Sequence, residues 1–559
     1  MTSEQETRLP VGRMVLCEGR GLKKLMEAGL AWLEHNHQAV NALNVFPVPD
    51  GDTGTNMMLT MRSAYSEIAD NDSRHVGKIA QGIAHGALMG ARGNSGVILS
   101  QIWRGFAREI ENLVGFNVEQ FAVAMRRASD TAYKGVVKPV EGTILTVIRQ
   151  AAEAAEIAAQ STDDLTEAFR MVVNRCHQAV AETPRLLQVL ADAGVVDAGG
   201  QGLTVILEGM LRYMRGEAIW LAEELVGEAE FEKALAPHTG EEQYNYDVQF
   251  LIKGYGLDVL IIRETIDGMG DSTLVVGDEN TVKVHVHVDD PGLPISYGVS
   301  QGTLLDVVVE NMHEQYQEFV RSRAAAPVAV PMVVQKQELV PGQVAVIAVA
   351  PGLGISQVFE SLGVARVVAG GQTMNPSTEE ILKAIEEVGT DKVIVLPNNK
   401  NIIMAAKNAC ELSSKHARVV PTRTIPQGVN ALLMLDPDGE LDDIIVGMET
   451  AAAEVATGEI TTATRDVELD GVQVQVGHVL GLANGKVCCA DADMSTVVKE
   501  TLAVMEVEDR ELLTLYYGAD TSAQDAEEMA GRIQGWHPHL EVEIVDGGQP
   551  HYFYIISAE

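Results

Sequence analysis

The stretch Asn44-Val45-Phe46-Pro47-Val48-Pro49-Asp50-Gly51-Asp52-Thr53-Gly54-Thr55-Asn56-Met57 decides the fold prediction for this chain. Its two carboxylates, Asp50 and Asp52, stand one residue apart on a loop that proline and glycine keep out of regular structure. Such acids are oxygen ligands of the kind that Mg²⁺ takes together with water and phosphate oxygens. Thr53, Thr55 and Asn56 follow with donors for an anion. We therefore predict a nucleotide–Mg²⁺ site, and the alternative is an acidic turn that binds nothing.

A second glycine-rich stretch, Gly90–Gly96, precedes the apolar run Val97-Ile98-Leu99. The free N–H groups at the start of a helix lie at the positive end of its dipole and suit phosphate. Asn94 and Ser95 would add side-chain donors. A plain helix–helix turn is the alternative, but beside the Asp50/Asp52 loop we favour phosphate binding. Arg92 either balances phosphate charge or faces solvent, and the sequence does not decide between the two.

Two further loops precede alanine-rich or apolar helical stretches. Thr143 ends the loop that begins at Lys138, and capping of the next helix explains it well. Asp197, in the loop Val195–Gly202, is also a candidate helix cap. Because no strand pattern separates these loops, we expect them to gather at one end of an all-helical bundle. The Walker string Gly-x-x-x-x-Gly-Lys-Ser/Thr is absent.

The Asn44–Met57 string resembles the metal loop of the dihydroxyacetone-kinase-type nucleotide domain, DhaL or DAK2. Together with Gly90–Gly96 it resembles the bacterial fatty acid kinase catalytic subunit in particular. The resemblance implies ATP and Mg²⁺ as cofactors and Asp50 and Asp52 as metal ligands. Dihydroxyacetone kinases carry a third acid upstream, where this chain offers Asn44 at a different spacing. The nucleotide contacts that the resemblance implies are Thr53, Gly54, Thr55, Asn56, Gly93, Asn94, Ser95, Gly96, Thr143, Asp197, Ala198 and Gly199, with the last three near the adenine and ribose.

Length, charge and cysteine usage limit the classes of protein to which the chain can belong. A chain of 559 residues suggests three or so domains, and its net charge of −38 argues against nucleic acid and against a polybasic membrane-binding surface. Five cysteines without framework spacing indicate reduced thiols. Residues 1–13 carry no signal core, and no run of about 18 apolar residues predicts a transmembrane segment. We expect a cytoplasmic protein.

Composition shifts divide the chain into five parts. A helical domain spans 1–215, an acidic linker 216–243, a middle α/β domain 244–323, a proline-marked linker 324–343 and a second α/β domain 344–559. Apolar residues recur at helical spacing over Gly21–His35, and the pattern continues over 63–89. The predicted fold class is therefore multidomain, with an all-α bundle, a small α/β middle domain and an α/β C-terminal domain, and the resemblance implies that the bundle is of the DhaL type.

The strand Val282–Asp289 is the informative part of the middle domain. Its valines share one face, and His285 and His287 share the other. Two imidazoles at this spacing can converge on Zn²⁺, although an exposed face is the common reading. In the resembled family a Tyr-Gly-Tyr-Cys string adds a cysteine ligand, where this chain has Asp247. The resemblance thus implies a Zn²⁺ site at His285, His287 and Asp247; alternatively, a histidine serves acyl or phosphoryl chemistry as donor or general acid.

From Val344 the pattern becomes strand–loop–helix, which predicts a largely parallel sheet with helices on both faces. Ligands of such sheets bind at the loops after the strands, where Gly371-Gln372-Thr373 and Asn398-Asn399 fall. Binding and loop shaping explain these residues equally well. This half resembles the C-terminal region of the catalytic chain of fatty acid kinase, similar in architecture to DegV-type lipid-binding proteins, and we expect it to bind the carrier protein.

The resemblance implies ATP-dependent phosphorylation of a fatty acid carboxylate, held by a separate fatty-acid-binding carrier protein, to an acyl phosphate for phospholipid synthesis. A carboxylate is already a nucleophile, so no strong base is needed. We expect a homodimer. The alternatives are a kinase for dihydroxyacetone or a similar small molecule, whose covalent-histidine substrate subunit is not recognisable here, and a nucleotide-sensing scaffold without turnover.

Overall fold

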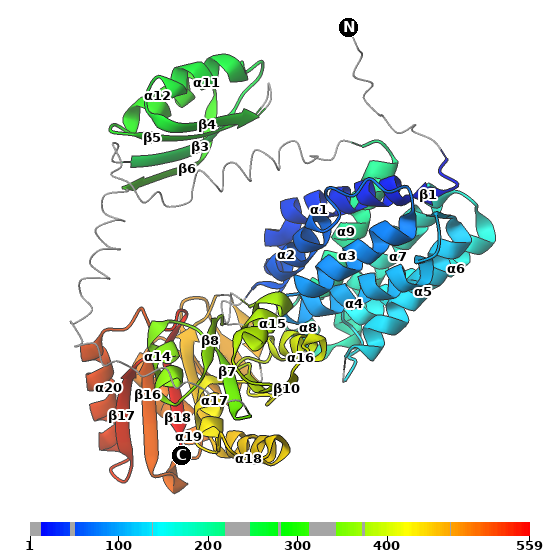
Figure 1. Cartoon of the computed structure of the whole chain (residues 1–559). Helices are drawn as coiled ribbons and strands as arrows, with labels where there is room; N and C mark the ends of the chain where they lie inside the picture. Colours follow the sequence, from blue (N-terminus) through cyan, green and yellow to red (C-terminus); the bar gives the residue numbers. More distant parts are fainter. Residues whose placement is uncertain are drawn as a thin grey trace. The chain divides into compact units, whose positions relative to one another are not determined.

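The computed structural model describes residues 13–44, 51–136, 138–217, 246–277, 281–311, 342–371, 375–464, 466–469 and 471–559. The chain divides into two compact units, one of Met1–Ile219 with Lys336–Glu559 and one of Trp220–Gln335 (Figure 1). Asp50, Gln372 and Thr373 lie outside the described residues, as do most of the two linkers predicted from composition.

A bundle of helices forms the N-terminal part of the first unit (Figure 1). Its only described strands, β1 (Cys17–Glu18) and β2 (Gly115–Phe116), make one short antiparallel pair. The prediction of a helical domain is confirmed. The helices are α1 (Gly19–Asn41), α2 (Thr53–Ser66), α3 (Val76–Met89), α4 (Gly93–Ile110), α5 (Val118–Lys134), α6 (Ile144–Ser161), α7 (Leu165–Leu186), α8 (Gln188–Asp192) and α9 (Ala198–Met214).

The apolar stripe predicted for α1 is buried in the core of this bundle, as period-3.6 spacing requires. Aromatic rings fill the middle of the core, where Phe121 stacks on Phe169 with ring centroids 4.6 Å apart. One helical prediction is wrong in detail, because the pattern over 63–89 is broken between α2 and α3. There Ser73 N–H donates to Asn71 Oδ1 at 3.1 Å, and such side-chain acceptors compete with helix formation.

The second unit contains a four-stranded antiparallel sheet of order β4-β5-β3-β6 with two helices. The alternation predicted for Val282–Asp289 is confirmed, because Val282, Val284, Val286 and Val288 are all buried. The elements are β3 (Tyr246–Lys253), α11 (Val259–Asp267), β4 (Asp271–Gly277), β5 (Thr281–Val288), α12 (Gly292–Gln301) and β6 (Thr303–Asn311).

The C-terminal part of the first unit opens with the predicted βα units. They build a parallel sheet of order β10-β9-β7-β8, whose central strand β7 is buried along its whole length. The elements are β7 (Val344–Ala350), α14 (Leu353–Ser361), β8 (Arg366–Ala369), α15 (Thr378–Glu387), β9 (Lys392–Leu396), α16 (Ile403–Leu412), β10 (His416–Val419), α17 (Ile425–Leu432) and α18 (Leu441–Glu454).

A second sheet follows, and it corrects the prediction of a largely parallel sheet. Its order is β15-β14-β11-β18-β16-β17, and only β16 and β17 pair in parallel. The C-terminal strand β18 enters the middle of the sheet and pairs antiparallel on both sides. The elements are β11 (Ala456–Thr462), β12 (Val467–Leu469), β13 (Val472–Val474), β14 (Val479–Ala483), β15 (Lys486–Asp491), α19 (Met494–Val504), a 3₁₀ turn (Val507–Asp509), β16 (Leu512–Tyr517), α20 (Ala523–Trp536), β17 (Glu541–Asp546) and β18 (Tyr552–Ala558).

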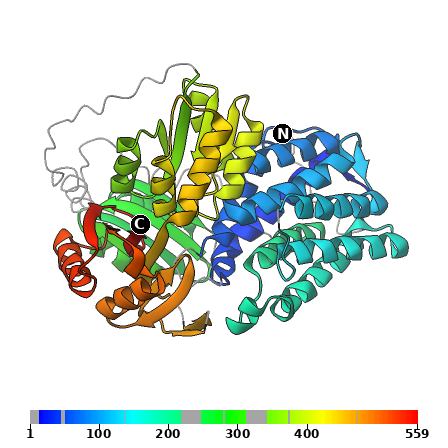
Figure 2. The ribbon, with the colours of Figure 1, turned by 90° about the horizontal axis from the view of Figure 1, so that it is seen from below.

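The bundle and the C-terminal part share a buried contact, which explains why they form one unit. Ala91 and Val97, at the start of α4, belong to the same apolar cluster as Ile381 of α15 and Ala405 of α16. Helix α16 packs on α4 and α15 on α3, and Figure 2 shows the yellow-green helices beside the blue ones. The N–H of Thr378 also donates to the Ala91 carbonyl at 3.2 Å.

Two further findings concern the helices and the cysteines of the described residues. None of the helices described there combines the length and apolar character needed to cross a bilayer. All five cysteines are free thiols. Burial raises the pKa of Cys17 and of Cys176 to about 12, so these two thiols stay protonated at neutral pH.

Candidate nucleotide and metal site

Asp52 lies at the start of α2, where the loop predicted around Thr53–Asn56 turns out to be the first helical turn. Only 7% of its surface is exposed, and its carbonyl accepts from the Asn56 N–H at 2.7 Å. The positive end of a helix dipole favours a carboxylate at this position. The structure therefore holds one of the two predicted metal ligands in a buried, electrostatically favourable place.

Asn41, the last residue of α1, caps α2, and this role was not predicted from the sequence. Its Oδ1 accepts from the N–H groups of Gly54 at 2.7 Å and Thr55 at 3.2 Å, and its Nδ2 donates to Thr55 Oγ1 at 3.0 Å. Asn41 ends a helical stretch, so nothing in its immediate pattern marks it. Asn44 Oδ1 accepts from Thr53 Oγ1 at 3.0 Å, and its role as a metal ligand stays a prediction.

Close packing of helices accounts for two of the predicted glycines. A Cβ on Gly54 would lie 2.2 Å from the His37 carbonyl oxygen, and one on Gly96 would lie 2.4 Å from Thr60 Oγ1. Both residues therefore let helices approach more closely than any side chain would allow. Their presence in the motif has a structural reason that is independent of phosphate.

The start of α4 is arranged differently, with N–H groups left open. Those of Gly93, Asn94 and Ser95 donate to no described residue, and the cap residue Arg92 offers no side-chain acceptor. Gly93 has φ +57°, and a Cβ there would lie 2.6 Å from Asn56 Nδ2. The open N–H groups of α4 thus lie beside the first turn of α2. This pairing of donors with a buried carboxylate is the arrangement that a metal–phosphate ligand needs.

The starts of α6 and α9 complete the gathering of helix ends that the sequence predicts. A Cβ on Gly199 would lie 3.3 Å from Ile144 Cβ, and one on Gly202 would lie 2.6 Å from the sulfur of Met57 in α2. Thr143 caps α6 by accepting from Leu145 N–H at 3.4 Å, and it donates to the Val140 carbonyl at 2.7 Å. The prediction that Thr143 caps α6 is confirmed, as is the prediction that Asp197 caps α9. The contacts of Thr143 and Asp197 with nucleotide stay predictions.

Asp197 caps α9 by accepting from the Gly200 N–H at 2.6 Å. Burial raises the pKa of Asp197 to about 6, although the N–H groups of Gly200 and Ile144 pull it down. The carboxyl group therefore changes charge just below neutral pH. Ala198 and Gly199, which follow it, are buried in the first turn of α9.

A residue of the C-terminal part, Asn375, contacts Asp52. Asn375, in the loop before α15, donates from Nδ2 to Asp52 Oδ2 at 2.5 Å. Arg92 donates to the Asn375 carbonyl at 2.9 Å and pairs with Glu380 at 3.1 Å. Burial raises the pKa of Glu380, but the Ser377 N–H and the Arg92 charge outweigh it, so the pKa is lowered overall. Arg92 thus pairs with Glu380, and whether it also balances phosphate charge stays open.

These residues fit a divalent metal. The Asp52 carboxylate and the Asn375 amide supply hard oxygen atoms in one buried place. The Asn375 Oδ1 is buried and has no hydrogen-bond partner among the described residues. Within the described chain, three histidine, cysteine or carboxylate ligand atoms come together only at Glu508, His537 and His539 in the C-terminal part. A second carboxylate for the Asp52 site would be Asp50.

The predicted zinc site can be followed only along the backbone. In the register of β3 and β5, Asp247 stands opposite His287 and Gln249 opposite His285. Asp271 of β4 stands opposite His287 on its other side. The side chains of these residues lie outside the described part of the structure. The strand pairing that the prediction requires is present, and the zinc ion itself stays a prediction.

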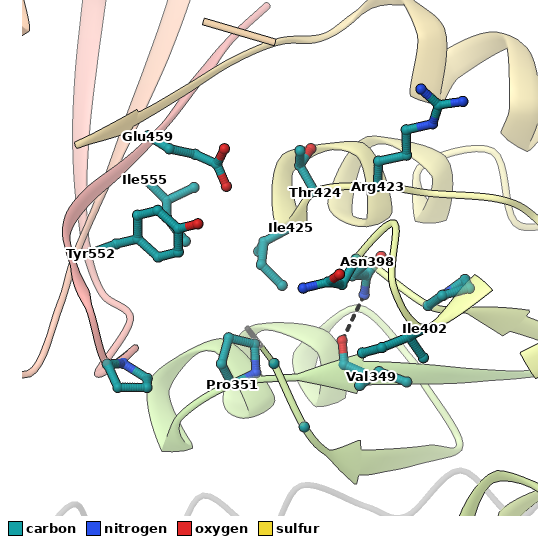
Figure 3. A pocket seen from close by; sticks show the side chains of 15 residues that line it. Val349, Pro351, Asn398, Ile402, Arg423, Thr424, Ile425, Glu459, Tyr552 and Ile555 are labelled. Carbon is teal, nitrogen blue, oxygen red and sulfur yellow. Dashed lines mark hydrogen bonds between the residues drawn. The ribbon is translucent and has the colours of Figure 1, made fainter. Parts of the chain in front are cut away.

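A cavity in the C-terminal part lies between its two sheets, and Figure 3 shows Pro351 and Asn398 on one side and Glu459 and Tyr552 on the other. Its volume is about 40 Å³, which is room for a few water molecules and far below what an acyl chain needs. Asn398, at φ +54°, donates to the Val349 carbonyl at 2.9 Å and accepts from Thr422 Oγ1 at 2.8 Å. Asn398 therefore shapes its loop through these two bonds, and binding at this cavity stays a prediction.

Comparison with known proteins supports this architecture. The chain matches the DAK2 domain over residues 47–212, the middle domain of FakA-like fatty acid kinases over 243–319 and the C-terminal domain of FakA-like fatty acid kinases over 345–559. An uncharacterized protein of Staphylococcus aureus (strain USA300) is 40% identical over 560 residues, covering 97% of this chain and 99% of that protein. Protein YloV of Bacillus subtilis (strain 168) is 39% identical over 555 residues, with the same coverage.

Solved structures resemble separate parts of the chain. A fatty-acid-binding DegV family protein from Thermus thermophilus is 12% identical and covers 39% of this chain and 99% of its own, with a TM-score of 0.31. The dihydroxyacetone kinase from C. freundii, in complex with AMP-PNP and Mg²⁺, is 18% identical and covers 38% of this chain and 37% of its own, with a TM-score of 0.28.

Fold and site define a multidomain protein in which a DAK2-type helical domain precedes α/β domains. The chain belongs to the FakA-like fatty acid kinase family.

Proposed function

We propose that this chain is the catalytic subunit of a fatty acid kinase, which transfers the γ-phosphoryl group of ATP to the carboxylate of a fatty acid. The observation that carries the proposal is the meeting of the buried Asp52 with the open N–H groups of α4, in a chain of this family. A carboxylate oxygen would form the new bond to phosphorus, while the bond from phosphorus to the β–γ bridging oxygen breaks and ADP leaves.

Separate residues would bind the metal ion and the phosphate groups. Asp52 and Asp50 would hold Mg²⁺, with Asn44 nearby, and the ion when bound would neutralise phosphate charge. The N–H groups of Gly93, Asn94 and Ser95 would bind phosphate oxygens at the positive end of α4. Positioning and charge neutralisation supply most of the catalysis in phosphoryl transfer, so the site needs no general base for a substrate that is already ionised.

A separate carrier protein would hold the acyl chain. The C-terminal part, which matches the C-terminal domain of FakA-like fatty acid kinases, would serve as the docking domain for the carrier. For the middle domain we propose a weak Zn²⁺ site at His285, His287 and Asp247, because the strand register places Asp247 opposite His287. Asp in place of Cys would hold zinc more loosely.

The test is an acyl-phosphate assay with hydroxylamine trapping on the purified full-length chain. Its arms contain ATP and Mg²⁺ with a lipid-loaded fatty-acid-binding protein, with the same protein stripped of lipid, or with dihydroxyacetone. We expect acyl hydroxamate and ADP only in the first arm. Turnover of dihydroxyacetone would favour a small-molecule kinase, and nucleotide binding without turnover in any arm would favour a nucleotide-sensing scaffold.

A further inference from the structure

Asn375 occupies an unusual place, because it comes from the C-terminal part yet lies at the predicted metal carboxylate. Only 1% of its surface is exposed, and its Nδ2 donates to Asp52 Oδ2 at 2.5 Å. The amide must face this way, since Oδ1 in the same position would set two acceptors against each other. The bond joins residues 323 positions apart in the sequence. It therefore links the two parts of the first unit directly at the site.

The other end of the same amide is unsatisfied. Asn375 Oδ1 is buried and has no partner among the described residues. Most buried polar atoms in proteins are hydrogen-bonded, and leaving one without a partner costs about 1–3 kcal/mol. An ideal Cβ on Gly93 would lie 3.6 Å from Asn375 Nδ2, so the amide is next to the start of α4 as well. The amide that carries the open acceptor thus contacts Asp52 and lies next to the open donors of α4.

The backbone that carries Asn375 is fixed from several directions. Arg92 donates to its carbonyl at 2.9 Å, and Thr378, three residues on, donates its N–H to Ala91. Ser377 and Glu380 form a capping box that begins α15 immediately after it. A side chain held on such a support is oriented before any ligand arrives, which is the condition for precise positioning.

The chemistry of the partner follows from the two acceptors. The Asp52 carboxylate is a ligand that a divalent cation takes, and the unpaired Asn375 Oδ1 can accept a hydrogen bond from water that such a cation carries. Phosphate oxygens at neutral pH have few protons to donate, so a phosphate alone leaves the amide oxygen unpaired. A divalent metal held by Asp52, with its bound water, supplies the missing donor.

We propose that Asn375 is a positioning residue of the nucleotide–metal site, supplied by the C-terminal part of the chain. Its Nδ2 orients the Asp52 carboxylate, and its Oδ1 accepts a hydrogen bond from water bound to the divalent metal. The inference rests on the nucleotide site of the proposed function. One consequence is that binding of metal–nucleotide and docking of the C-terminal part on α2 and α4 stabilise each other, because such coupling is reciprocal.

The experiment compares Asn375→Ala with the unmodified full-length chain by calorimetric titration of a non-hydrolysable ATP analogue, once with Mg²⁺ and once with EDTA. Asn430→Ala is the matched control, because it removes another side-chain amide bond of the C-terminal part, from α17 to the Ala451 carbonyl of α18 at 2.7 Å, at residues that the proposed nucleotide site does not use. We expect Asn375→Ala to weaken binding about tenfold with Mg²⁺, the size of one hydrogen bond to a charged group, and to leave binding in EDTA unchanged. The control should stay within about twofold under both conditions.

The outcomes separate this inference from the proposed function. If Asn375→Ala binds like the control with Mg²⁺, or weakens equally with Mg²⁺ and EDTA, the residue is structural and the inference is wrong, while the proposed kinase activity stands. If the unmodified chain shows no Mg²⁺-dependent nucleotide binding, the proposed function itself fails. Should Asn375→Ala melt before the assay temperature, Asn375→Ser, which keeps one hydrogen-bonding group, provides the same Mg²⁺-to-EDTA ratio.

Discussion

Two regions of this chain combine glycine with asparagine, and they use their polar atoms in opposite ways. Around Asn398, the side-chain amide donates to Val349 and accepts from Thr422, and Gly428 packs against it. Around Gly93, three N–H groups and the Asn375 Oδ1 have no partner among the described residues. Proteins rarely leave buried polar groups unpaired, so those that remain open mark the place where a ligand belongs. The contrast separates a loop whose side-chain amide is satisfied within the fold from one that keeps donors and an acceptor open for the ligand that we propose.

The largest expected effect comes from removing the carboxylate at the open region. We expect Asp52→Ala, and likewise Asp50→Ala, to lower Mg²⁺-dependent ATP turnover by at least about a thousandfold, because each change removes a charged ligand from the phosphate site. Turnover is measured by ADP release with lipid-loaded carrier. Asp130→Ala, on the exposed face of α5, is the control with full activity. Unchanged turnover in Asp52→Ala would remove the basis of the nucleotide assignment.

A pair of glycine substitutions tests the contrast directly. In Gly93→Ala, the left-handed backbone at φ +57° costs about 1–2 kcal/mol and a Cβ meets Asn56 Nδ2, so we expect lower stability and at least about tenfold weaker nucleotide binding. In Gly428→Ala, a Cβ would lie 2.1 Å from Asn398 Oδ1. This variant should lose about 1–3 kcal/mol of stability through overpacking.

Denaturant unfolding and calorimetric titration of both glycine variants give the answer. Both should unfold at lower denaturant, but only Gly93→Ala should lose nucleotide affinity. Equal loss of affinity in the two variants would mean that the Asn398 region also contributes to the nucleotide site, and the contrast between the regions would disappear.

A smaller effect is expected at Asp197, whose pKa burial raises to about 6. A raised pKa means that the folded state disfavours the charged form, so this group stabilises the fold below pH 4 and the contribution is lost as pH rises through 6. Asp197→Asn keeps an oxygen to cap α9 but never ionises. We expect the variant to gain about 1–3 kcal/mol over the unmodified chain at pH 7.5 and roughly a third of that at pH 4.5. The free energies of unfolding of both proteins at the two pH values measure this gain. A difference between the two proteins that does not change with pH would contradict the raised pKa of Asp197.

The smallest effect concerns zinc in the middle domain. A carboxylate holds Zn²⁺ more loosely than a thiolate, so we expect substoichiometric zinc in the purified chain and a rise toward one ion per chain in Asp247→Cys. Elemental analysis after mild chelation measures the number of zinc ions per chain. One tight zinc that survives Asp247→Ala would show that another residue is the ligand. If neither the unmodified chain nor Asp247→Cys contains zinc, and His287→Ala keeps full activity, the two histidines only form an exposed strand face.

Periodic and local features could be predicted from the sequence because their causes are local. The buried stripe of α1, the buried valines of β5 and the caps at Thr143 and Asp197 all follow from spacing or from the residue before a helix.

Contacts between distant parts could not be predicted in this way. Asn375 reaches Asp52 only because α15 packs against the bundle, and no spacing rule connects them. The antiparallel sheet was missed for a related reason. Strand β11 contains Gly458 and three threonines and lacks a run of branched apolar residues, so its pairing with β18 depends on tertiary structure.

The most direct test of the account is a crystal structure of the full-length chain with Mg²⁺ and a non-hydrolysable ATP analogue. We predict phosphate oxygens within hydrogen-bonding distance of the Gly93, Asn94 and Ser95 N–H groups and a metal ion on Asp52. A nucleotide bound elsewhere, or a metal ion away from Asp52 with the start of α4 still empty, would contradict the account.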